Sequence, residues 1–415
     1  MGDRESVHLG DICRFQAGDA FPKEKQGDSC GDVPFIKVSD MNLPGNELNI
    51  VRSNNWLSEI EARNYRTHPA GAVVFAKIGE ALKANRRRIL LKPTIIDNNM
   101  MSASPLGQTD PRWLFYVLQN LDFNEISRGS ALPYLAASDL KTIRLDIPQS
   151  SEQIAIANVL SALDEKIELN RQLNATLESL ADTIFRDWFV DFGPVRRRME
   201  GATDPVKILG GLISQKEQAE SLAALFPDAL SEDGIPGGWS CKTLEDALTL
   251  VYGKALPKTA RVDGHVPVYG SGGIGGTHNI ALASGPGIIV GRKGTVGSLF
   301  WEAGDFYAID TVFYVQAKEG FSLEYLWQLL RTLNLDTMNT DAAVPGLNRN
   351  NAYRLEVVFS NQQTRDAFGK IAKSFRSRAD AAEAESRTLA ELRDRLLPRL
   401  MSGEIGATDT PRADV

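Results

Sequence analysis

One stretch, from Ser150 to Phe189, restricts the possible folds of this chain more than any other. Two series of residues recur there at seven-residue intervals, the second four positions after the first, as at the a and d positions of a coiled coil. They are Ile156, Leu163, Asn170, Leu177 and Ile184, and Leu160, Ile167, Asn174, Ala181 and Trp188. At ~1.5 Å per residue, about 40 residues make a helix roughly 60 Å long. The pattern therefore predicts a long helix whose apolar seam needs a partner.

The partner is predicted between Gln362 and Met401, where residues again recur every seven positions, each at the same spacing from its counterpart in the first helix. The second helix therefore looks like a repeat of the first. Antiparallel pairing would place Asn170 and Asn174 opposite Ala382 and Ser386, which suits a pairing fixed by polar contacts. The alternative is two unrelated helices at the edges of separate domains. The residues predicted to form the seam are Ile156, Leu163, Leu177, Ile184, Phe368, Phe375, Leu389 and Leu396.

Composition limits the function classes. The 415 residues predict two or three domains of ordinary globular composition. No apolar run reaches the ~18 residues of a membrane span, and no apolar segment follows Met1, so we expect neither a membrane span nor a signal peptide. The three scattered cysteines indicate a reducing, cytoplasmic location and no zinc site. A net charge of −7 argues against a protein that coats nucleic acid by itself, but not against a local DNA-binding patch.

Two globular segments precede the two helices, and they resemble each other. Gly18–Lys23 matches Gly253–Lys258, and Lys77 matches Lys293. The shared order of such matches, each time followed by a long helix, predicts a duplicated unit and a pseudo-two-fold molecule. The expected boundaries are 1–149 and 238–360 for the globular segments, 150–190 and 361–405 for the helices, 191–237 for a connector and 406–415 for a tail.

Candidate catalytic groups are few. The glycine-rich stretch Ser271–Thr277 could cradle a phosphate, but a turn between strands is favoured because no Lys-Ser/Thr ending follows. Asp164-Glu165-Lys166 could end a nuclease triad, but its place on the first helix favours a solvated face. No P-loop and no Asp/Asn-Pro-Pro-aromatic tetrapeptide occurs. We therefore predict no catalytic residue, metal or cofactor in this chain.

Basic, amide and glycine-rich loops occur at matched places in the two globular segments. Arginine and lysine bind phosphates and guanine edges, and asparagine reads adenine edges. A basic run is often only a solvated surface, but repetition at matched places makes DNA binding an equally good interpretation. The residues predicted to bind DNA are Lys77, Lys83, Arg86, Arg87, Arg88, Arg128, Ser130, Arg292, Lys293, Thr295, Asn348 and Arg349.

Four phrases give the chain a family resemblance. They are DWFVDFGPV at Asp187–Val195, LFPD leading to IPGGW at Leu225–Trp239, IVGRKGTVG at Ile289–Gly297 and LLPRLMSGEI at Leu396–Ile405. With the order globule, helix, globule, helix, the chain resembles the specificity subunits of type I restriction-modification systems. The first globule departs from the third phrase, because it keeps Lys77 but has Ala76 before it. Ala76 should therefore not inherit the role of an arginine.

This resemblance implies an α+β fold with two mixed α/β target recognition domains, separated by two long antiparallel coiled-coil-like helices. Each domain would read one half of a bipartite target in double-stranded DNA. The helices would set the gap between the halves and dock two methyltransferase (modification) subunits, which would bind S-adenosylmethionine. Restriction/translocase subunits would join for cleavage, and the specificity subunit would not be an enzyme by itself. The alternative is a structural adaptor whose duplicated heads bind proteins.

Overall fold

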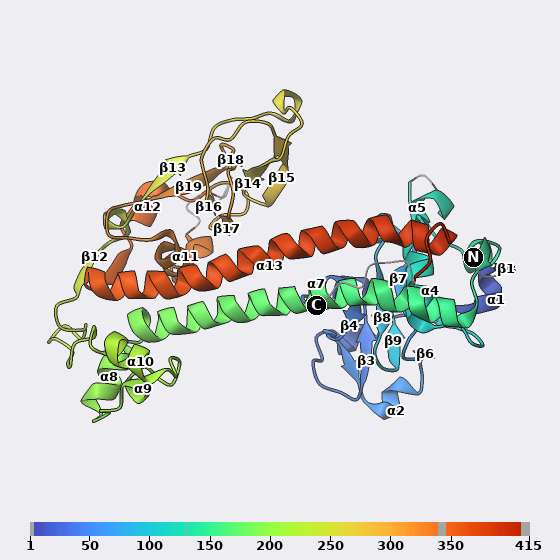
Figure 1. The fold of residues 1–415 in the computed structure, drawn as a ribbon, viewed down its shortest axis with the longest axis horizontal. Helices are drawn as coiled ribbons and strands as arrows, with labels where there is room; N and C mark the ends of the chain where they lie inside the picture. The colour runs from blue at the N-terminus through green and yellow to red at the C-terminus, as the bar shows by residue number, and fades with distance from the viewer. Residues whose placement is uncertain (1–3, 130, 339–345, 408–415) are drawn as a thin grey trace. The chain divides into compact units, whose positions relative to one another are not determined.

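Two compact units make up the computed structural model, which describes residues 4–129, 131–338 and 346–407 (Figure 1). Unit 1 comprises Met1–Arg171 and Glu383–Val415, and unit 2 comprises Gln172–Ala382. Two long helices, α7 (Ser150–Phe185) and α13 (Gln362–Ser402), contribute to both units. A π-helical turn, η3 (Arg186–Val190), follows α7. The predicted fold class, mixed α/β with two long helices, is confirmed.

The described part of unit 1 contains three sheets, with strand orders β2-β10-β7-β8-β4, β5-β3-β9-β6 and β1-β11. In the sheet that begins at β2, neighbours are antiparallel except β4 and β8, and in the second sheet β3 runs parallel to β9. The strands are β1 (Glu5–His8), β2 (Cys13–Ala17), β3 (Val33–Ile36), β4 (Asn49–Ile50), β5 (Trp56–Leu57), β6 (Thr67–His68), β7 (Val73–Ala76), β8 (Arg87–Leu90), β9 (Thr94–Ile96), β10 (Met100–Pro105) and β11 (Arg144–Ile147). The short helices are α1 (Leu9–Ile12), η1 (Lys23–Lys25), η2 (Val38–Asn42), α2 (Glu59–Ala62), α3 (Glu80–Lys83), α4 (Pro111–Gln119), α5 (Phe123–Ile126) and α6 (Ala137–Lys141).

Helix α4 joins the main sheet of unit 1 to the long helices. Asp110 caps it by accepting hydrogen bonds from the N–H groups of Arg112 and Trp113, and proline at the first helical position suits a helix start. Its apolar residues are buried in one core with β7, β10, the start of α7 and the end of α13. The N-terminal half of α7 is therefore part of the core of unit 1.

Unit 2 repeats this arrangement with strand orders β13-β19-β16-β17, β15-β14-β18 and β12-β20. Its strands are β12 (Ser240–Thr243), β13 (Leu248–Tyr252), β14 (Val266–Gly270), β15 (Gly273–His278), β16 (Gly287–Gly291), β17 (Leu299–Glu302), β18 (Tyr307–Ala308), β19 (Val312–Ala317) and β20 (Glu356–Phe359). Its short helices are α8 (Gly193–Met199), α9 (Pro205–Ile208), α10 (Lys216–Ala223), η4 (Leu244–Asp246), η5 (Lys258–Ala260), α11 (Leu323–Thr332), η6 (Leu335–Thr337) and α12 (Arg349–Tyr353).

Matching backbone hydrogen bonds establish which residues of the two units correspond. The N–H of Gly18 donates to the carbonyl of Met100, as that of Gly253 donates to Val312. The N–H of Leu9 donates to Ile143, as that of Leu244 donates to Leu355. These pairs keep the spacing between counterparts that the sequence matches suggested. The units therefore share one chain path, which is what a duplication produces.

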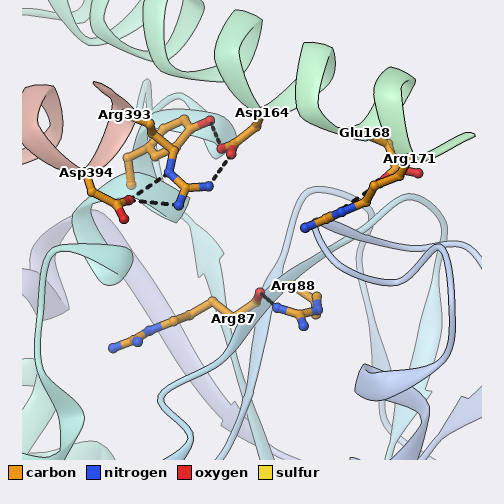
Figure 2. A network of polar contacts seen from close by, with 8 residues as sticks. Arg87, Arg88, Asp164, Glu168, Arg171, Arg393 and Asp394 are labelled. Atoms are coloured by element: carbon orange, nitrogen blue, oxygen red, sulfur yellow. Dashed lines mark hydrogen bonds and ion pairs between the residues drawn. The ribbon is translucent and has the colours of Figure 1, made fainter. Parts of the chain in front are cut away.

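In unit 1, α7 and α13 pair in the antiparallel direction through a buried polar network (Figure 2). Asp164 accepts hydrogen bonds from the hydroxyl of Tyr116 (2.7 Å) and from Nη1 of Arg393 (2.5 Å). Figure 2 shows Arg393 between Asp164 and Asp394, with Nη2 of Arg393 2.8 Å from Asp394. Because only 7% of Asp164 is exposed, the interpretation of Asp164-Glu165-Lys166 as a solvated face is wrong at this residue.

Further along the same pairing, Nδ2 of Asn170 donates to Glu385 (2.7 Å) and to Ser386 (3.3 Å). The predicted position of Asn170 opposite Ser386 is therefore what the structure shows. In unit 2, Arg376 of α13 forms an ion pair with Glu178 of α7 at 3.3 Å. The pairing direction is again antiparallel, because Phe368, earlier in α13, contacts Phe185, later in α7, with ring centroids 5.4 Å apart.

The residues predicted to form the seam mostly face inward. Ile156 is buried in the core of unit 1, and Leu177, Ile184 and Phe368 are buried within unit 2. Leu163, Phe375, Leu389 and Leu396 are half-buried. The segment expected to be a connector forms the short helices α8, α9 and α10, which pack around the end of α7 in the core of unit 2.

A pH dependence follows from His68, whose imidazole is buried in unit 1 with Nδ1 2.6 Å from Oγ of Ser102. Burial, and then the positive charge of Arg66, lowers the pKa of His68 to about 4. The unfolded chain therefore binds this proton at higher pH than the folded chain does, and unit 1 loses stability as the pH falls from about 6.5 toward 4. At about 1.4 kcal/mol per pH unit, we expect a loss of about 3 kcal/mol.

Thermal unfolding of the native chain and of His68→Gln between about pH 7.5 and pH 4 tests this expectation. The variant cannot take up the proton, so its melting temperature should fall less steeply over this range. Equal slopes for the two proteins would show that His68 does not titrate as inferred.

Candidate nucleic-acid interface

A tight loop between β16 and β17 presents Arg292, Lys293 and Thr295 in unit 2. The loop is closed by hydrogen bonds from the N–H of Gly297 to the carbonyl of Gly291 (2.9 Å) and from the N–H of Gly291 to Ser298 (2.7 Å). Gly297 has a φ of +70°, and a Cβ there would lie 2.3 Å from the backbone nitrogen of Asp336, so only glycine fits. Lys293 and Thr295 are exposed and Arg292 is half-buried. The fold therefore holds these polar side chains at a defined edge.

The loop before α12 brings Arg349 to the same place. The N–H of Leu347 donates to the carbonyl of Arg292 (2.8 Å), and Asn348 caps α12 through its side-chain oxygen. The guanidinium carbons of Arg292 and Arg349 each lie 4.9 Å from the ring centroid of Tyr252, the last residue of β13. Two predicted residues from well-separated stretches of the sequence thus share one aromatic ring.

Sequence reasoning missed Tyr252, whose side chain is 45% exposed. The sequence did contain a signal for Tyr252, because this aromatic residue stands directly before Gly253, the first residue of a stretch that matches the first globular segment. Its counterpart in the first unit is Ala17, so no repeated pattern marked it.

In unit 1, Lys77 follows β7 and lies beside the segment that ends at Leu135. Its N–H donates to Asn99, and its carbonyl accepts from the N–H of Leu135 (2.8 Å). Arg128 exchanges two backbone hydrogen bonds with Tyr134 in the same segment, and its side chain forms an ion pair with Asp139. Lys77 and Arg128 therefore flank one stretch of backbone, with Lys77 half-buried and Arg128 exposed.

The other predicted residues of unit 1 lie elsewhere. Lys83, at the end of α3, is exposed and pairs with Glu80 (2.6 Å), and Arg86 is exposed and bonds to Asn42. Arg88 lies in a pocket against α7, toward Arg171, as Figure 2 shows. Burial, and then the charges of Arg86 and Arg171, lowers the pKa of Arg88 to about 10. Ser130 lies outside the described residues.

Arg87 contacts the interior of unit 1. Only 1% of the residue is exposed, its guanidinium lies 3.8 Å from the ring centroid of Phe123, and it donates to the carbonyls of Asn85 and Leu121. Burial lowers the pKa of Arg87 to about 10. Because these contacts use the guanidinium within the fold, we leave Arg87 out of the proposed DNA-contacting set.

The structure also corrects one match between the units. The N–H of Leu135 donates to the carbonyl of Lys77 as that of Leu347 donates to the carbonyl of Arg292. The preceding strand residues are in the same register, since Ala76 lies opposite Met100 and Gly291 lies opposite Val312. Lys77 therefore corresponds to Arg292, and the sequence match to Lys293 was wrong by one position. Arg128 and Arg349 do not correspond either, because Arg349 begins α12 and the matching helix α6 begins at Ala137.

The glycine-rich stretch of unit 2 is a hairpin. Tyr269 pairs with Ile274 and Gly270 with Gly273, so Ser271 and Gly272 form a two-residue turn between β14 and β15. The favoured interpretation as a turn is confirmed at Ser271 and Gly272, while Gly273–Thr277 belong to strand β15. Among the residues described, no group of three or more His, Cys, Asp or Glu side chains could hold a metal ion. No helix within the described ranges combines the length and the apolar character that a membrane span requires.

Comparison with known proteins defines the class. Residues 1–179 match the family described as "Type I restriction modification DNA specificity domain". The sequence is 25% identical to the type I restriction enzyme HindI specificity subunit of Haemophilus influenzae, over 98% of this chain and 100% of that protein. It is 26% identical to the type I restriction enzyme MjaIX specificity subunit of Methanocaldococcus jannaschii, over 55% of this chain and 48% of that protein.

The fold agrees with these matches. The crystal structure of the S subunit of a type I restriction-modification system from M. genitalium covers 96% of each chain with a TM-score of 0.58, at 17% identity. The resemblance inferred from the sequence is thereby confirmed: the chain is similar to a type I restriction enzyme specificity subunit over nearly its whole length, and residues 1–179 match the DNA specificity domain of that family.

Proposed function

We propose that each globular segment, 1–149 and 238–360, is a target recognition domain that reads one half of a bipartite sequence in double-stranded DNA. The observation that carries this proposal is the repetition of a cationic site on a repeated backbone. Lys77 and Arg292 follow corresponding strands, β7 and β16, and each accepts a hydrogen bond from the segment that precedes α6 or α12. A protein with two equivalent binding sites suits a target with two half-sites on one duplex, because the symmetry of the target mirrors that of the protein.

The long helices would then determine the gap between the half-sites and dock two methyltransferase subunits. Those subunits would bind S-adenosylmethionine and carry the catalytic residues, while restriction/translocase subunits would join the same complex for cleavage. The net charge of −7 fits this division, because the partners would supply much of the cationic surface that DNA requires. The polar contacts between α7 and α13 in each unit support a fixed register of the pair.

Replacing Lys77 or Arg292 by alanine tests the DNA sites. In the complex assembled with the methyltransferase subunits, each variant should lose one cationic contact. We expect affinity for target DNA to fall by about 1–3 kcal/mol if a base contact is lost, and the slope of log K against log salt to flatten by about one if a phosphate contact is lost. Fluorescence anisotropy at several salt concentrations measures both quantities.

Lys242→Ala provides the matched control, because Lys242 is an exposed lysine on β12, away from these loops. It should leave affinity and salt slope close to those of the native complex. If Lys77→Ala and Arg292→Ala both behave like this control, the proposed interface is wrong.

A further inference from the structure

Unit 2 holds two guanidinium groups on one aromatic ring, an arrangement that the described residues of unit 1 do not contain. The residues of this stack are Tyr252, Arg292 and Arg349, with both guanidinium carbons 4.9 Å from the ring centroid. They come from β13, from the loop after β16 and from the start of α12. Three separate stretches of chain therefore converge on one ring, and two of them bring a positive charge to it.

The guanidinium groups of the stack keep donors for a ligand. Arg292 uses one N–H on the carbonyl of Asp310 (3.0 Å). Nε of Arg349 is buried without a hydrogen-bond partner among the described residues, so the terminal nitrogens of Arg349 are the donors that a ligand would meet. Within that same part of the chain, neither guanidinium forms an ion pair with a carboxylate. Arg376 differs, because its guanidinium lies 4.8 Å from the Trp301 ring centroid but also pairs with Glu178.

The ring lowers the cost of this arrangement without removing the charge. A cation over the face of tyrosine is attracted by the ring quadrupole, by about 0.5–1 kcal/mol at exposed sites. Both guanidinium groups keep their positive charge at the ring, so a ligand with several hydrogen-bond acceptors would complete the site. The planar fork of arginine fits two neighbouring acceptors at once, such as O6 and N7 of guanine or two oxygens of a phosphate.

The corresponding positions in unit 1 have different chemistry. By the shared hydrogen bonds of the two units, Tyr252, Arg292 and Arg349 correspond to Ala17, Lys77 and Ala137. At these three positions unit 1 therefore has one ammonium group, and it has neither the ring nor the second guanidinium group. An ammonium group is a point charge and lacks the fork that selects paired acceptors.

We infer that the stack makes unit 2 select a pair of adjacent hydrogen-bond acceptors on DNA, with Arg292 and Arg349 as the contacting groups and Tyr252 as their positioning residue. Unit 1 reads its half of the target without this device, so the two half-sites are recognised by different chemistry. This inference rests on the proposed function, because it assigns a specificity to one of the two proposed DNA sites.

The test uses the complex with the methyltransferase subunits and a duplex that carries the methylated motif found by sequencing DNA from cells with the native system. Arg292→Lys and Arg349→Lys keep the charge and remove the fork. Tyr252→Leu keeps apolar bulk and removes the ring. We expect each to weaken binding about 5- to 100-fold, the range of one bidentate contact. Arg331→Lys is the matched control, since its guanidinium lies on Trp327 in another part of unit 2.

Modified duplexes identify the acceptors. If the source is guanine, replacing N7 by carbon in one half-site guanine should weaken the native complex and abolish the further effect of Arg→Lys. If the source is phosphate, replacing one backbone phosphate of the half-site by a methylphosphonate should instead weaken the native complex and abolish the further effect of Arg→Lys. Native affinity in all three variants, together with weakened binding by Lys77→Ala, would overturn the inference and leave the proposed function intact. If Lys77→Ala and Arg292→Ala also bind with native affinity, both the inference and the proposed function are overturned.

Discussion

Asp164→Ala is expected to destabilise the pairing of α7 with α13 in unit 1 by about 3 kcal/mol, the lower end for breaking a buried ion pair. Asp164 is 7% exposed and accepts from both Tyr116 (2.7 Å) and Arg393 (2.5 Å). Removing the carboxylate leaves a buried hydroxyl and a partly buried guanidinium without this partner. Burial, and then the charge of Asp164, raises the pKa of Tyr116, so the phenol stays protonated and its O–H is left without the carboxylate to which it donates.

Hydrogen exchange along the C-terminal half of α13 measures the effect. A double-mutant cycle with Arg393→Ala isolates the pairwise contribution, which should exceed about 1 kcal/mol because the two side chains are in contact. Asp394→Ala is the control, since that carboxylate also bonds Arg393 but its side chain is 66% exposed. Equal, small effects of Asp164→Ala and Asp394→Ala would show that the buried network does not hold the helices.

Unit 2 also has an ion pair between α7 and α13, but a residue of this pair has the opposite charge to its counterpart in the first repeat. Arg376 is the counterpart of Asp164, at the spacing that also relates Phe368 to Ile156, and it pairs with Glu178 at 3.3 Å. Its guanidinium also stacks on two tryptophan rings, Trp301 and Trp327. Both carboxylates are therefore on α7 and both guanidinium groups on α13. Since like charges would meet if α7 paired with a second α7, this arrangement favours pairing of α7 with α13.

Inserting four residues into both helices, after Leu173 in α7 and after Ala382 in α13, is expected to lengthen the gap between the methylated half-sites by one or two base pairs. Each insertion adds ~6 Å and about 400° of rotation, so each seam turns by only about 40°. At ~3.4 Å per base pair, ~6 Å approaches two steps. The insertions leave the contacts of Asp164 with Arg393 and of Glu178 with Arg376 intact, so the half-site bases should not change.

Methylome sequencing of cells that contain the variant and its methyltransferase partner reads the gap directly. A matched pair of two-residue insertions is the control, because about 200° of rotation turns each seam away from its partner and should abolish methylation. A four-residue variant that methylates DNA with an unchanged gap would show that the helices do not set the spacing.

The sequence by itself determined the repeated architecture. Heptad spacing is a local property of a helix, so the positions of Ile156 and Phe368 predicted both long helices and their shared register. The spacing between matched stretches survives in the hydrogen bonds of Gly253 and Leu355 because homologous stretches adopt the same backbone. The basic residues at the edges of both units were also visible, since charge is read directly from the chain.

Only the tertiary structure decided which of these residues are available and which belong together. Arg87, Arg88 and Arg86 are neighbours in sequence, but alternation along β8 buries Arg87 against Phe123 and leaves Arg86 exposed at the strand start. The register of β16 against β19 showed that Lys77 corresponds to Arg292. The sequence alignment alone could be shifted by one position, and it had matched Lys77 to Lys293. Tyr252 reaches Arg292 and Arg349 only through strand pairing and loop closure. Contacts between residues so far apart in the chain depend on packing that no local pattern encodes.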